Sequence, residues 1–325
     1  MITAAYIYME KFKGLRTGDA DRLTHLNFAF ALVKDGKATI DHWPDKEFAR
    51  EFIKSNGRLK AILSVGGWGA GGFSPAVATA ESREIFAQSL VDIADDYGFD
   101  GIDMDWEYPC SDMAGIEASP ADKTNYTAFI RILRDKLGRD RIVSMAAGAG
   151  QDCADNLEIP ALVELMDFIN IMSYDMCPWD YVSHHTSLYP SEFTKNRCCH
   201  DAVAILEKAG VPRDRLVLGA AFYGRVYNNV DGPDAPASGP PEFSGGYENA
   251  VKLAEAAGGT QYDDNAEAPY AYNKEERIFI TYENPRSLAA KMKYVKSTGM
   301  GGVMFWEYSS DTPDSLLLKS LVGDI

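Results

Sequence analysis

The stretch Asp100-Gly101-Ile102-Asp103-Met104-Asp105-Trp106-Glu107 alternates strictly between apolar and acidic side chains from Ile102 onward. Successive side chains of a β-strand point to opposite faces, so the three carboxylates share one face and the apolar residues between them share the other. Amphipathic helices are predicted on both sides of this strand, over Glu84–Tyr97 and Lys123–Leu137. The apolar face expected for the first helix consists of Ile85, Phe86, Leu90, Ile93 and Ala94. A buried strand between two helices is typical of parallel sheets with helical crossovers.

The same alternation of short apolar runs and helical segments extends along the whole chain. Eight runs are interpreted as strands: Ile2–Tyr8, His25–Leu32, Leu59–Val65, Gly101–Trp106, Arg141–Ala147, Phe168–Tyr174, Leu216–Tyr223 and Gly301–Trp306. Eight strand–helix units predict a closed (β/α)8 TIM barrel of the α/β class, a fold that typically takes about 250 residues. The competing fold, a doubly wound open sheet, would have a glycine-rich phosphate loop after the first strand, where Met9-Glu10-Lys11-Phe12 stands instead.

The length beyond a plain barrel lies mostly between Val226 and Thr281, where the helix after the seventh strand is delayed. We expect residues 1–226 and 282–325 to form the barrel, and residues 227–281 to form a small α+β subdomain inserted between strand 7 and helix 7. Its apolar residues would supply a small core: Tyr247, Leu253, Tyr262, Tyr270, Tyr272, Ile278 and Ile280. Asn284-Pro285 then predicts the start of the delayed helix, with Asn as N-cap and Pro at the first helical position.

Composition excludes several classes of function. The 325 residues contain 32 basic and 48 acidic side chains, for a net charge of −16 at pH 7. Such an acidic chain has no broad attraction for phosphate backbones or anionic lipid, so we expect neither a nucleic acid nor a membrane as partner. No apolar run approaches the roughly 18 residues of a membrane span. We expect a monomer.

The cysteines and histidines do not indicate a metal site. The five cysteines are scattered without a CxxC pair, and their odd number leaves at least one thiol free. Cys198-Cys199 beside His200 lack the spacing of zinc ligands, so we interpret them as thiols on a helix surface. We expect no metal and no cofactor.

The N-terminus leaves the compartment open. Met1 is followed at once by the first strand, without the charged and then apolar segments of a secretory signal. The protein is therefore expected in the cytoplasm if Met1 is the native start, and outside the cell if a signal has been removed.

The acidic strand points to acid–base chemistry. Its apolar face belongs under the helices, which leaves Asp103, Asp105 and Glu107 facing the barrel interior, with Glu107 at the C-terminal mouth where barrel active sites lie. Like charges at such short range cannot all be ionised, so the three carboxyls titrate as a coupled set. This arrangement can keep Glu107 protonated near neutral pH, as a general acid requires.

The stretch Asp100–Pro109 strongly resembles the DxxDxDxE signature of glycoside hydrolase family 18, in its chitinase form. Further segments agree with the family pattern in order along the chain: Ser64-Val65-Gly66-Gly67-Trp68, Met172-Ser173-Tyr174-Asp175, Tyr223-Gly224-Arg225 and Met304-Phe305-Trp306. The segment between the seventh and eighth strands also resembles the α/β insertion of the chitinase A-like branch.

The resemblance implies a role for each catalytic residue. Glu107 would protonate the glycosidic oxygen while the substrate's own N-acetyl carbonyl attacks the anomeric carbon. Asp105 would stabilise the resulting oxazolinium, and Asp103 would share a proton with Asp105, helped by the hydroxyls of Ser64 and Tyr6. Tyr174 would orient the acetamido oxygen, and Asp175 would bind the distorted sugar.

The resemblance also implies a set of substrate contacts. Trp306 would form the floor of the −1 subsite, lined by Met172 and Met304. Trp68 and Trp179 would contact the aglycone side. The remaining matched positions are Tyr6, Phe30, Ser64, Gly67, Tyr108, Tyr223 and Arg225. Trp43 and Trp106 are interpreted as packing residues.

The activity implied is hydrolysis of β-1,4 linkages between N-acetylglucosamine units of chitin or chitooligosaccharides. One alternative is a related enzyme, an endo-β-N-acetylglucosaminidase or a peptidoglycan glucosaminidase, although those branches usually lack the Asp-Trp-Glu-Tyr-Pro form and the insertion. The alternative from another class is a chitin-binding lectin on the same barrel, but family lectins have generally lost the acidic residue that Glu107 supplies. Chain-length preference, endo or exo action and processivity stay open.

Overall fold

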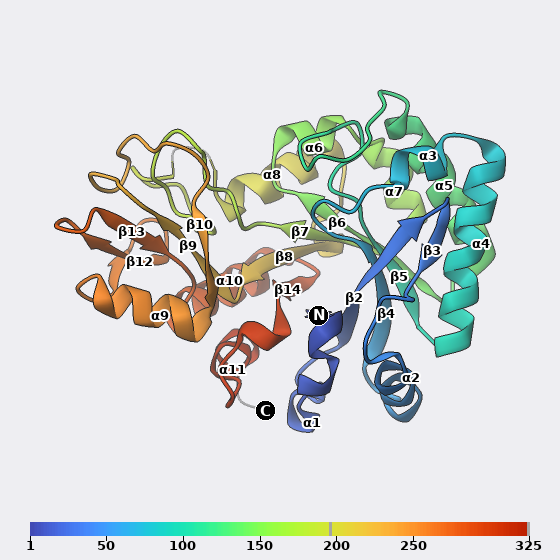
Figure 1. Cartoon of the computed structure of the whole chain (residues 1–325), viewed down its shortest axis with the longest axis horizontal. Helices are drawn as coiled ribbons and strands as arrows, with labels where there is room; N and C mark the ends of the chain where they lie inside the picture. The colour runs from blue at the N-terminus through green and yellow to red at the C-terminus, as the bar shows by residue number, and fades with distance from the viewer. Residues whose placement is uncertain (195–196, 324–325) are drawn as a thin grey trace.

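A computed structural model describes residues 1–194 and 197–323 of the chain. Eight parallel strands close into a barrel in the order β1-β14-β8-β7-β6-β5-β4-β2, and the pairing of β2 with β1 completes the circle (Figure 1). The strands are β1 (Ile2–Tyr8), β2 (His25–Lys34), β4 (Lys60–Gly66), β5 (Gly101–Asp105), β6 (Ile142–Gly148), β7 (Phe168–Met172), β8 (Leu216–Ala221) and β14 (Gly302–Trp306). The eight-stranded barrel predicted from the sequence is therefore confirmed.

Helices surround the barrel, and a short strand β3 (Lys37–Thr39) forms a hairpin with the end of β2. The helices are α1 (Thr17–Ala20), α2 (Lys46–Ser55), α3 (Phe73–Val77), α4 (Ala80–Tyr97), α5 (Asp122–Leu137), α6 (Gln151–Asp155), α7 (Ile159–Leu165), α8 (Cys199–Ala209), α10 (Pro285–Thr298) and α11 (Leu316–Val322). Short 3₁₀ turns are η1 (Met9–Gly14), η2 (Arg213–Arg215) and η3 (Tyr308–Ser310). Most of the apolar core lies between the strands and this helical layer.

Local signals set the ends of the two best-defined helices. Thr79 and Asn284 cap α4 and α10 through reciprocal hydrogen bonds with Ser82 and Ser287, so backbone N–H groups at each first turn are satisfied. The predicted start of α10 at Asn284-Pro285 is confirmed. The predicted burial of Ile85 on α4 is wrong, because this side chain is 42% exposed. It lies about 100° around the helix from Phe86, which heads the buried stripe.

Strand register brings polar side chains together inside the barrel. Asp103 on β5 pairs with Ser64 on β4 and with Ser144 on β6, so these three residues share one level of the inner face. An apolar cluster occupies other parts of the barrel. Its buried residues are Ala4, Tyr6, Ala29, Ala146, Phe168, Met172, Val217 and Met304. Asp105, on the same face of β5 as Asp103, adds a second buried carboxyl, so the barrel combines polar and apolar side chains.

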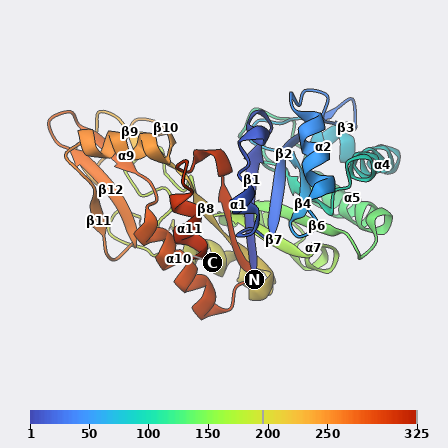
Figure 2. The same ribbon diagram turned by 90° about the horizontal axis from the view of Figure 1, so that it is seen from below.

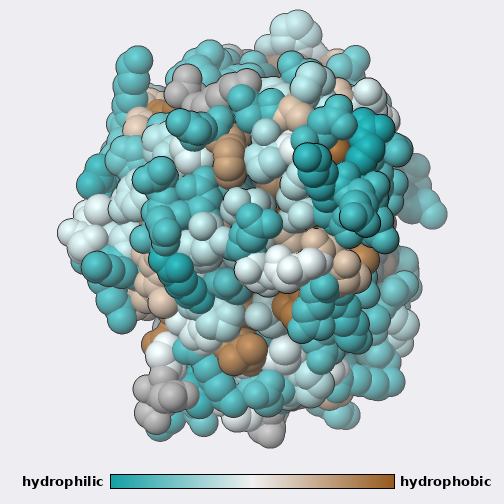
Figure 3. Space-filling view, turned by 90° about the vertical axis from the view of Figure 1, so that its left-hand side faces the viewer, coloured by the Kyte–Doolittle hydropathy of each residue, from teal (hydrophilic) through white to brown (hydrophobic). Residues whose placement is uncertain are grey.

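A second, antiparallel sheet lies beside the barrel, with strand order β10-β9-β13-β12-β11 (Figures 1 and 2). Its elements are β9 (Tyr223–Tyr227), β10 (Glu242–Gly246), α9 (Tyr247–Ala256), β11 (Gln261–Asp263), β12 (Ala268–Asn273) and β13 (Ile278–Thr281). The face that this part presents on the left of Figure 1 is mostly hydrophilic, with small separate hydrophobic spots (Figure 3).

The junction of barrel and second sheet differs from the expected single strand over Leu216–Tyr223. The barrel strand β8 ends at Ala221, and Tyr223 begins β9, which pairs with β10 and β13. Tyr223 and Arg225 thus reach the barrel mouth from the second sheet. The division of the chain at residues 226/227 and 281/282 stays a prediction.

The interpretation of Cys198 and Cys199 as surface thiols is wrong. Both side chains are buried, and all five cysteines, each within the described part of the chain, are free thiols. Cys199 packs inward at the start of α8, where its Sγ lies 3.5 Å from the carbonyl oxygen of Ser173. The hydrophobic character of a free cysteine accounts for this placement.

Candidate active site

The predicted catalytic residues gather at the carboxyl ends of the barrel strands. Asp105 is the last residue of β5, and Glu107 lies two residues beyond it. Tyr174 and Asp175 follow the end of β7, and Trp306 is the last residue of β14. Because parallel strands end at the same rim, segments far apart in sequence meet at one mouth.

Asp103 lies deepest and is fully buried. Its Oδ2 accepts hydrogen bonds from the hydroxyls of Tyr6 (2.8 Å) and Ser64 (2.9 Å), as expected from the sequence. Its Oδ1 accepts hydrogen bonds from Ser144 (2.6 Å) and from the amide of Asn170 (3.2 Å), two residues that sequence reasoning missed. Burial raises the pKa of Asp103, while these four donors oppose the rise by favouring the ionised form.

Asp105 lies between Asp103 and Glu107 in an environment that disfavours its charge. Its side chain is buried, and its Oδ1 makes no hydrogen bond to any described residue. Burial raises the pKa of Asp105 well above its usual range, and the charges of Glu107 and Asp103 raise it further. A carboxyl group in this position favours its protonated form.

Glu107 is the outermost of the three acids and is half-buried. Burial, with a smaller contribution from the charge of Asp175, raises its pKa to about 7, although a hydrogen bond with Tyr108 works in the opposite direction. A carboxyl with this pKa is substantially protonated at neutral pH and can lose the proton during a reaction. These are the properties of a general acid that later serves as a general base.

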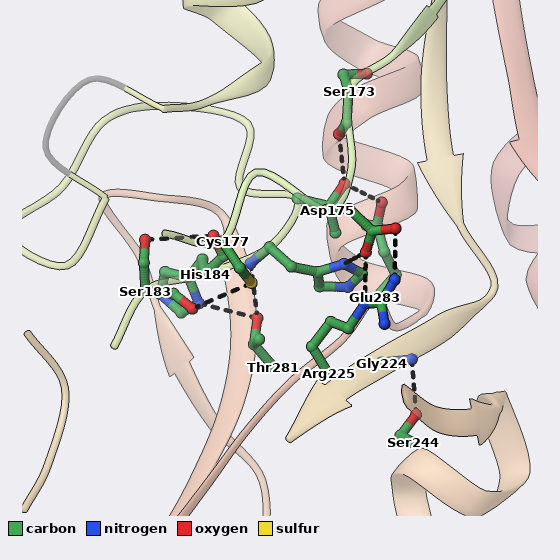
Figure 4. A network of polar contacts seen from close by, with 12 residues as sticks. Ser173, Asp175, Cys177, Ser183, His184, Gly224, Arg225, Ser244, Thr281 and Glu283 are labelled. Atoms are coloured by element: carbon green, nitrogen blue, oxygen red, sulfur yellow. Dashed lines mark hydrogen bonds and ion pairs between the residues drawn. The ribbon is translucent and has the colours of Figure 1, made fainter. Parts of the chain in front are cut away.

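Asp175 is ionised and held by charge pairing. Its Oδ1 and Oδ2 each accept a 2.6 Å hydrogen bond from the guanidinium of Arg225, an arrangement drawn in Figure 4. The Nδ1 of His185 lies 3.6 Å from Oδ1. Despite the opposing effect of burial, these two partners hold the pKa of Asp175 well below its usual range. The sequence analysis assigned no role at the site to His185.

Tyr174 lies next to this ion pair. Its hydroxyl points to the Sδ of Met304 at 3.9 Å, and its ring packs edge-on against Tyr223 with centroids 6.1 Å apart. Burial raises the pKa of Tyr174 well above its usual range, so the phenol keeps its proton and is a hydrogen-bond donor. Phe243, an exposed residue of β10 that the sequence did not single out, packs on Tyr223.

The indole of Trp306 forms the floor of the mouth. It stacks on Phe30, with ring centroids 5.4 Å apart and an interplanar angle of 14°, and it also contacts Tyr6. Met172 and Met304 belong to the apolar cluster packed against it. Gly67 makes room for this arrangement, because a Cβ there would come 2.7 Å from the ring of Phe30. A flat apolar ring at this place suits the apolar face of a sugar.

Two further tryptophans are exposed near the rim. Trp68 is 61% exposed and packs edge-on against Tyr108, the residue after Glu107. Trp179 is 60% exposed in the segment after β7, where its carbonyl accepts a hydrogen bond from Gly239. Trp68 is therefore connected to Glu107 through Tyr108. No described ring contact links Trp179 to the other predicted site residues. Trp43 and Trp106 are buried packing residues, as expected.

Within residues 1–194 and 197–323, no group of three or more His, Cys, Asp or Glu side chains is arranged to hold a metal ion. In the same ranges, no helix has the length and apolar character that a bilayer crossing requires.

A barrel with this acidic strand and aromatic floor defines a class of sugar-cleaving enzymes, and comparison with known proteins identifies the family. Residues 3–311 match the family described as Glycosyl hydrolases family 18, and the chain belongs to this family.

Individual relatives support this assignment. The chain is 36% identical over 299 residues to "Chitinase A1" of Niallia circulans, covering 82% of this chain and 42% of that protein. It is 37% identical over 285 residues to "Endochitinase 1" of Metarhizium robertsii, covering 81% of this chain and 65% of that protein. The chain thus spans between about two fifths and two thirds of these relatives.

A solved structure matches along nearly the whole length of both chains. It is a glycoside hydrolase family 18 N-acetylglucosaminidase from Paenibacillus barengoltzii, with a TM-score of 0.91 and 34% sequence identity. The match covers 99% of this chain and 98% of that one.

Proposed function

We propose that this chain hydrolyses β-1,4 linkages between N-acetylglucosamine units of chitin or chitooligosaccharides, with retention of configuration at the anomeric carbon. The observation that carries the proposal is Glu107, a carboxyl with a pKa of about 7 at the mouth of the barrel. Two chitinases among the relatives support the choice of substrate. The protein needs no cofactor for this reaction and acts as a monomer.

In the first step, Glu107 gives its proton to the glycosidic oxygen as the bond from that oxygen to the anomeric carbon breaks. The carbonyl oxygen of the substrate's own acetamido group forms the new bond to the anomeric carbon, which gives an oxazolinium ion. The Tyr174 hydroxyl donates a hydrogen bond to the acetamido oxygen and orients it for attack. Trp306 supports the sugar ring from below.

The protonation states of the other acids favour this substrate-assisted route over attack by a protein carboxylate. Asp105 has a pKa well above its usual range, and a protonated carboxyl is a poor nucleophile. Asp175 is ionised, but each of its oxygens already accepts a hydrogen bond from Arg225. Neither group is therefore available as a free carboxylate, whereas the acetamido oxygen arrives with the substrate.

In the second step, Glu107 removes a proton from water, and the hydroxyl oxygen bonds to the anomeric carbon as the oxazolinium ring opens. Asp105 shares a proton with Asp103. When that proton lies on Asp103, the ionised Asp105 accepts a hydrogen bond from the acetamido N–H and stabilises the positive charge. Two successive displacements at one carbon give retention.

Product analysis tests the proposal. Chitotetraose and chitohexaose are digested, and the products and their anomeric form are followed by chromatography and proton NMR. We expect cleavage with initial formation of the β-anomer, no cleavage of cellotetraose or fully deacetylated chitosan oligomers, and inhibition by a thiazoline mimic of the intermediate. Efficient cleavage of oligomers without N-acetyl groups would refute the mechanism.

A second candidate, release of single N-acetylglucosamine units from a chain end, is favoured by one observation. The solved structure from Paenibacillus barengoltzii described above is an N-acetylglucosaminidase, and the match covers 98% of its length. The same digest separates the two activities, because chitobiose as the first product indicates a chitinase and N-acetylglucosamine indicates an exo-acting enzyme.

The remaining alternatives are tested with two more assays. Cleavage of glycoproteins or of peptidoglycan without cleavage of chitooligosaccharides would indicate an endo-β-N-acetylglucosaminidase or a peptidoglycan glucosaminidase. Binding of chitin with no turnover would indicate a lectin, which the presence of Glu107 disfavours.

A further inference from the structure

A buried ion pair lies outside the reaction site. Lys291 on α10 and Glu283, just before that helix, are in direct contact through Nζ and Oε1, and each side chain is 1% exposed. Transfer of two charges from water to an interior costs several kcal/mol per ion, which their mutual attraction repays only with good geometry and further hydrogen bonds. Such a pair adds little net stability compared with apolar packing. The other hydrogen bonds of Lys291 and Glu283 therefore indicate the role of the pair.

The main further contact of Lys291 is with Thr186. The Nζ of Lys291 donates a 2.5 Å hydrogen bond to the Thr186 hydroxyl, and that hydroxyl donates a 2.8 Å hydrogen bond to the carbonyl oxygen of Ser173. An ammonium group can only donate, so the single hydroxyl proton of Thr186 is directed away from Lys291. Two acceptors lie within reach of this proton, the carbonyl oxygen of Ser173 at 2.8 Å and the Oε1 of Glu283 at 3.4 Å. The nearer one is Ser173, so the chain of hydrogen bonds runs from Lys291 through Thr186 to Ser173.

Ser173 connects this chain to the candidate active site. It immediately precedes Tyr174 and Asp175, the two site residues that follow β7. Its own hydroxyl accepts a 2.9 Å hydrogen bond from the backbone N–H of Gly219 on β8. Lys291 also reaches the carbonyl oxygen of Gly219 at 3.4 Å. The peptide before Tyr174 is thus held from two sides.

The residue beside Thr186 makes a second set of contacts to the same segment. His185 accepts a 3.0 Å backbone hydrogen bond from Met176, and its ring lies 3.6 Å from Asp175. The backbone N–H of His185 donates a 3.3 Å hydrogen bond to the hydroxyl of Thr281 on β13. Residues 185 and 186 therefore contact the stretch 173–176 at both of its ends. Figure 4 shows Ser173, Asp175, Arg225 and Glu283 gathered in this cluster.

We propose that Thr186, held in place by the buried Lys291–Glu283 pair, is a positioning residue that sets Tyr174 and Asp175 for the reaction. The inference rests on the proposed function, in which Tyr174 orients the acetamido group. Since displacement of a reacting group by about 1 Å can lower a rate by roughly 100-fold, loss of one remote hydroxyl has a measurable effect on kcat.

The test compares Thr186→Val, Thr186→Ala and Thr186→Ser with the wild-type enzyme. Valine keeps the shape and removes the hydroxyl, whereas serine keeps the hydroxyl. Thr127→Val is the matched control, because Thr127 is also buried and, among the described residues, its hydroxyl bonds only to a carbonyl on its own helix α5. Melting temperature, kcat and KM on chitotetraose are measured for each protein.

We expect kcat of the folded hydroxyl-free variants to fall by roughly 10- to 100-fold, KM to change by less than about threefold, and Thr186→Ser to keep kcat within about threefold of wild type. Thr127→Val is expected to lose stability with an unchanged kcat. A hydroxyl-free variant with wild-type kcat would overturn the proposal. Failure of both hydroxyl-free variants to fold, while Thr186→Ser folds, would also overturn it, since the hydroxyl would then serve stability alone.

Failure of the proposed function gives a different result. In that case the wild-type protein itself has no activity on chitotetraose. Crystal structures of wild type and Thr186→Val then test whether Thr186 positions Tyr174 and Asp175. The proposal then predicts that Tyr174 and Asp175 move by more than about 0.5 Å, the tolerance of a preorganised site. Superimposable Tyr174 and Asp175 would contradict it.

Discussion

The Asp175 carboxylate and the Arg225 guanidinium form a two-pronged ion pair, with both Nε–Oδ1 and Nη2–Oδ2 at 2.6 Å. Asp175 follows barrel strand β7, and Arg225 lies on β9 of the second sheet. The pair therefore joins the two parts of the molecule at the mouth of the barrel. Bidentate pairs of this kind fix geometry as well as charge.

The charge of Asp175 contributes to the raised pKa of Glu107. In Asp175→Asn this negative charge is lost and Arg225 remains, so the pKa of Glu107 falls. Because kcat/KM requires protonated Glu107, its decline on the alkaline side, expected near pH 7 in the wild type, should move to lower pH. A pH profile of kcat/KM on chitotetraose measures the shift.

The control for this prediction is Asp231→Asn. Asp231 pairs with Arg277 on the exposed side of the second sheet, so its removal changes the net charge equally without touching the site. If the alkaline decline of kcat/KM moved equally in both variants, net charge, and not the Asp175 carboxylate, would set the pKa of Glu107.

Ser144 supports the buried carboxyl of Asp103 with a 2.6 Å hydrogen bond. Ser144→Ala leaves Oδ1 with one donor fewer, so we expect the free energy of unfolding to fall by about 1–3 kcal/mol. Urea denaturation measures the loss. Ser320→Ala removes a hydroxyl that bonds to the backbone of its own helix near the surface, and its expected effect is within about 0.5 kcal/mol. Equal losses in the two variants would show that Asp103 does not depend on this donor.

The exposed indoles of Trp68 and Trp179 bury little of their own surface, so their replacement has little effect on folding. Each stacking contact with a sugar contributes about 1 kcal/mol, so Trp68→Ala and Trp179→Ala should each raise KM for chitohexaose roughly fivefold, with an unchanged melting temperature. Tyr189→Ala, which removes a partly exposed aromatic ring packed against Tyr294, is the control. Unchanged KM in both tryptophan variants would remove these residues from the cleft.

Glu107 also affects how stability depends on pH. Its pKa is about 7 in the folded chain against an ordinary value of 4.5, so the folded state binds the proton more tightly than the unfolded chain. The free energy of unfolding therefore falls as pH rises from 4.5 to 7. Glu107→Gln removes this dependence and should be more stable than wild type at pH 8 by up to about 3 kcal/mol, with little difference at pH 4. A variant less stable than wild type at pH 8 would contradict the raised pKa.

Most of the barrel could be predicted because its strands are marked locally. Helical segments separate the eight apolar runs from one another, and alternation alone placed Asp103, Asp105 and Glu107 on the inner face. The end of β8 could not be predicted in this way. Leu216–Tyr223 is continuously apolar, and only the pairing of Tyr223 with β10 shows that a new strand has begun.

Contacts that depend on tertiary structure could not be predicted from the sequence either. Ser144 and Asn170 each stand as a polar residue in an apolar strand, which is a signal for an inward polar contact, but register is needed to place both beside Asp103. His185 and Phe243 carry no comparable signal, since both lie in segments whose path depends on the second sheet. Burial of Cys198 and Cys199 was missed because the sequence just before them is polar.

Glu107 is proposed to supply the proton for cleavage, and the decisive measurement is the kcat of Glu107→Gln on chitotetraose. Glutamine keeps the shape and hydrogen-bonding capacity of the side chain but has no proton to donate to the leaving oxygen. We expect kcat to fall by at least about 10²–10⁴-fold while binding of the oligosaccharide, measured by calorimetry, is retained. A folded Glu107→Gln variant with near wild-type kcat would contradict the account.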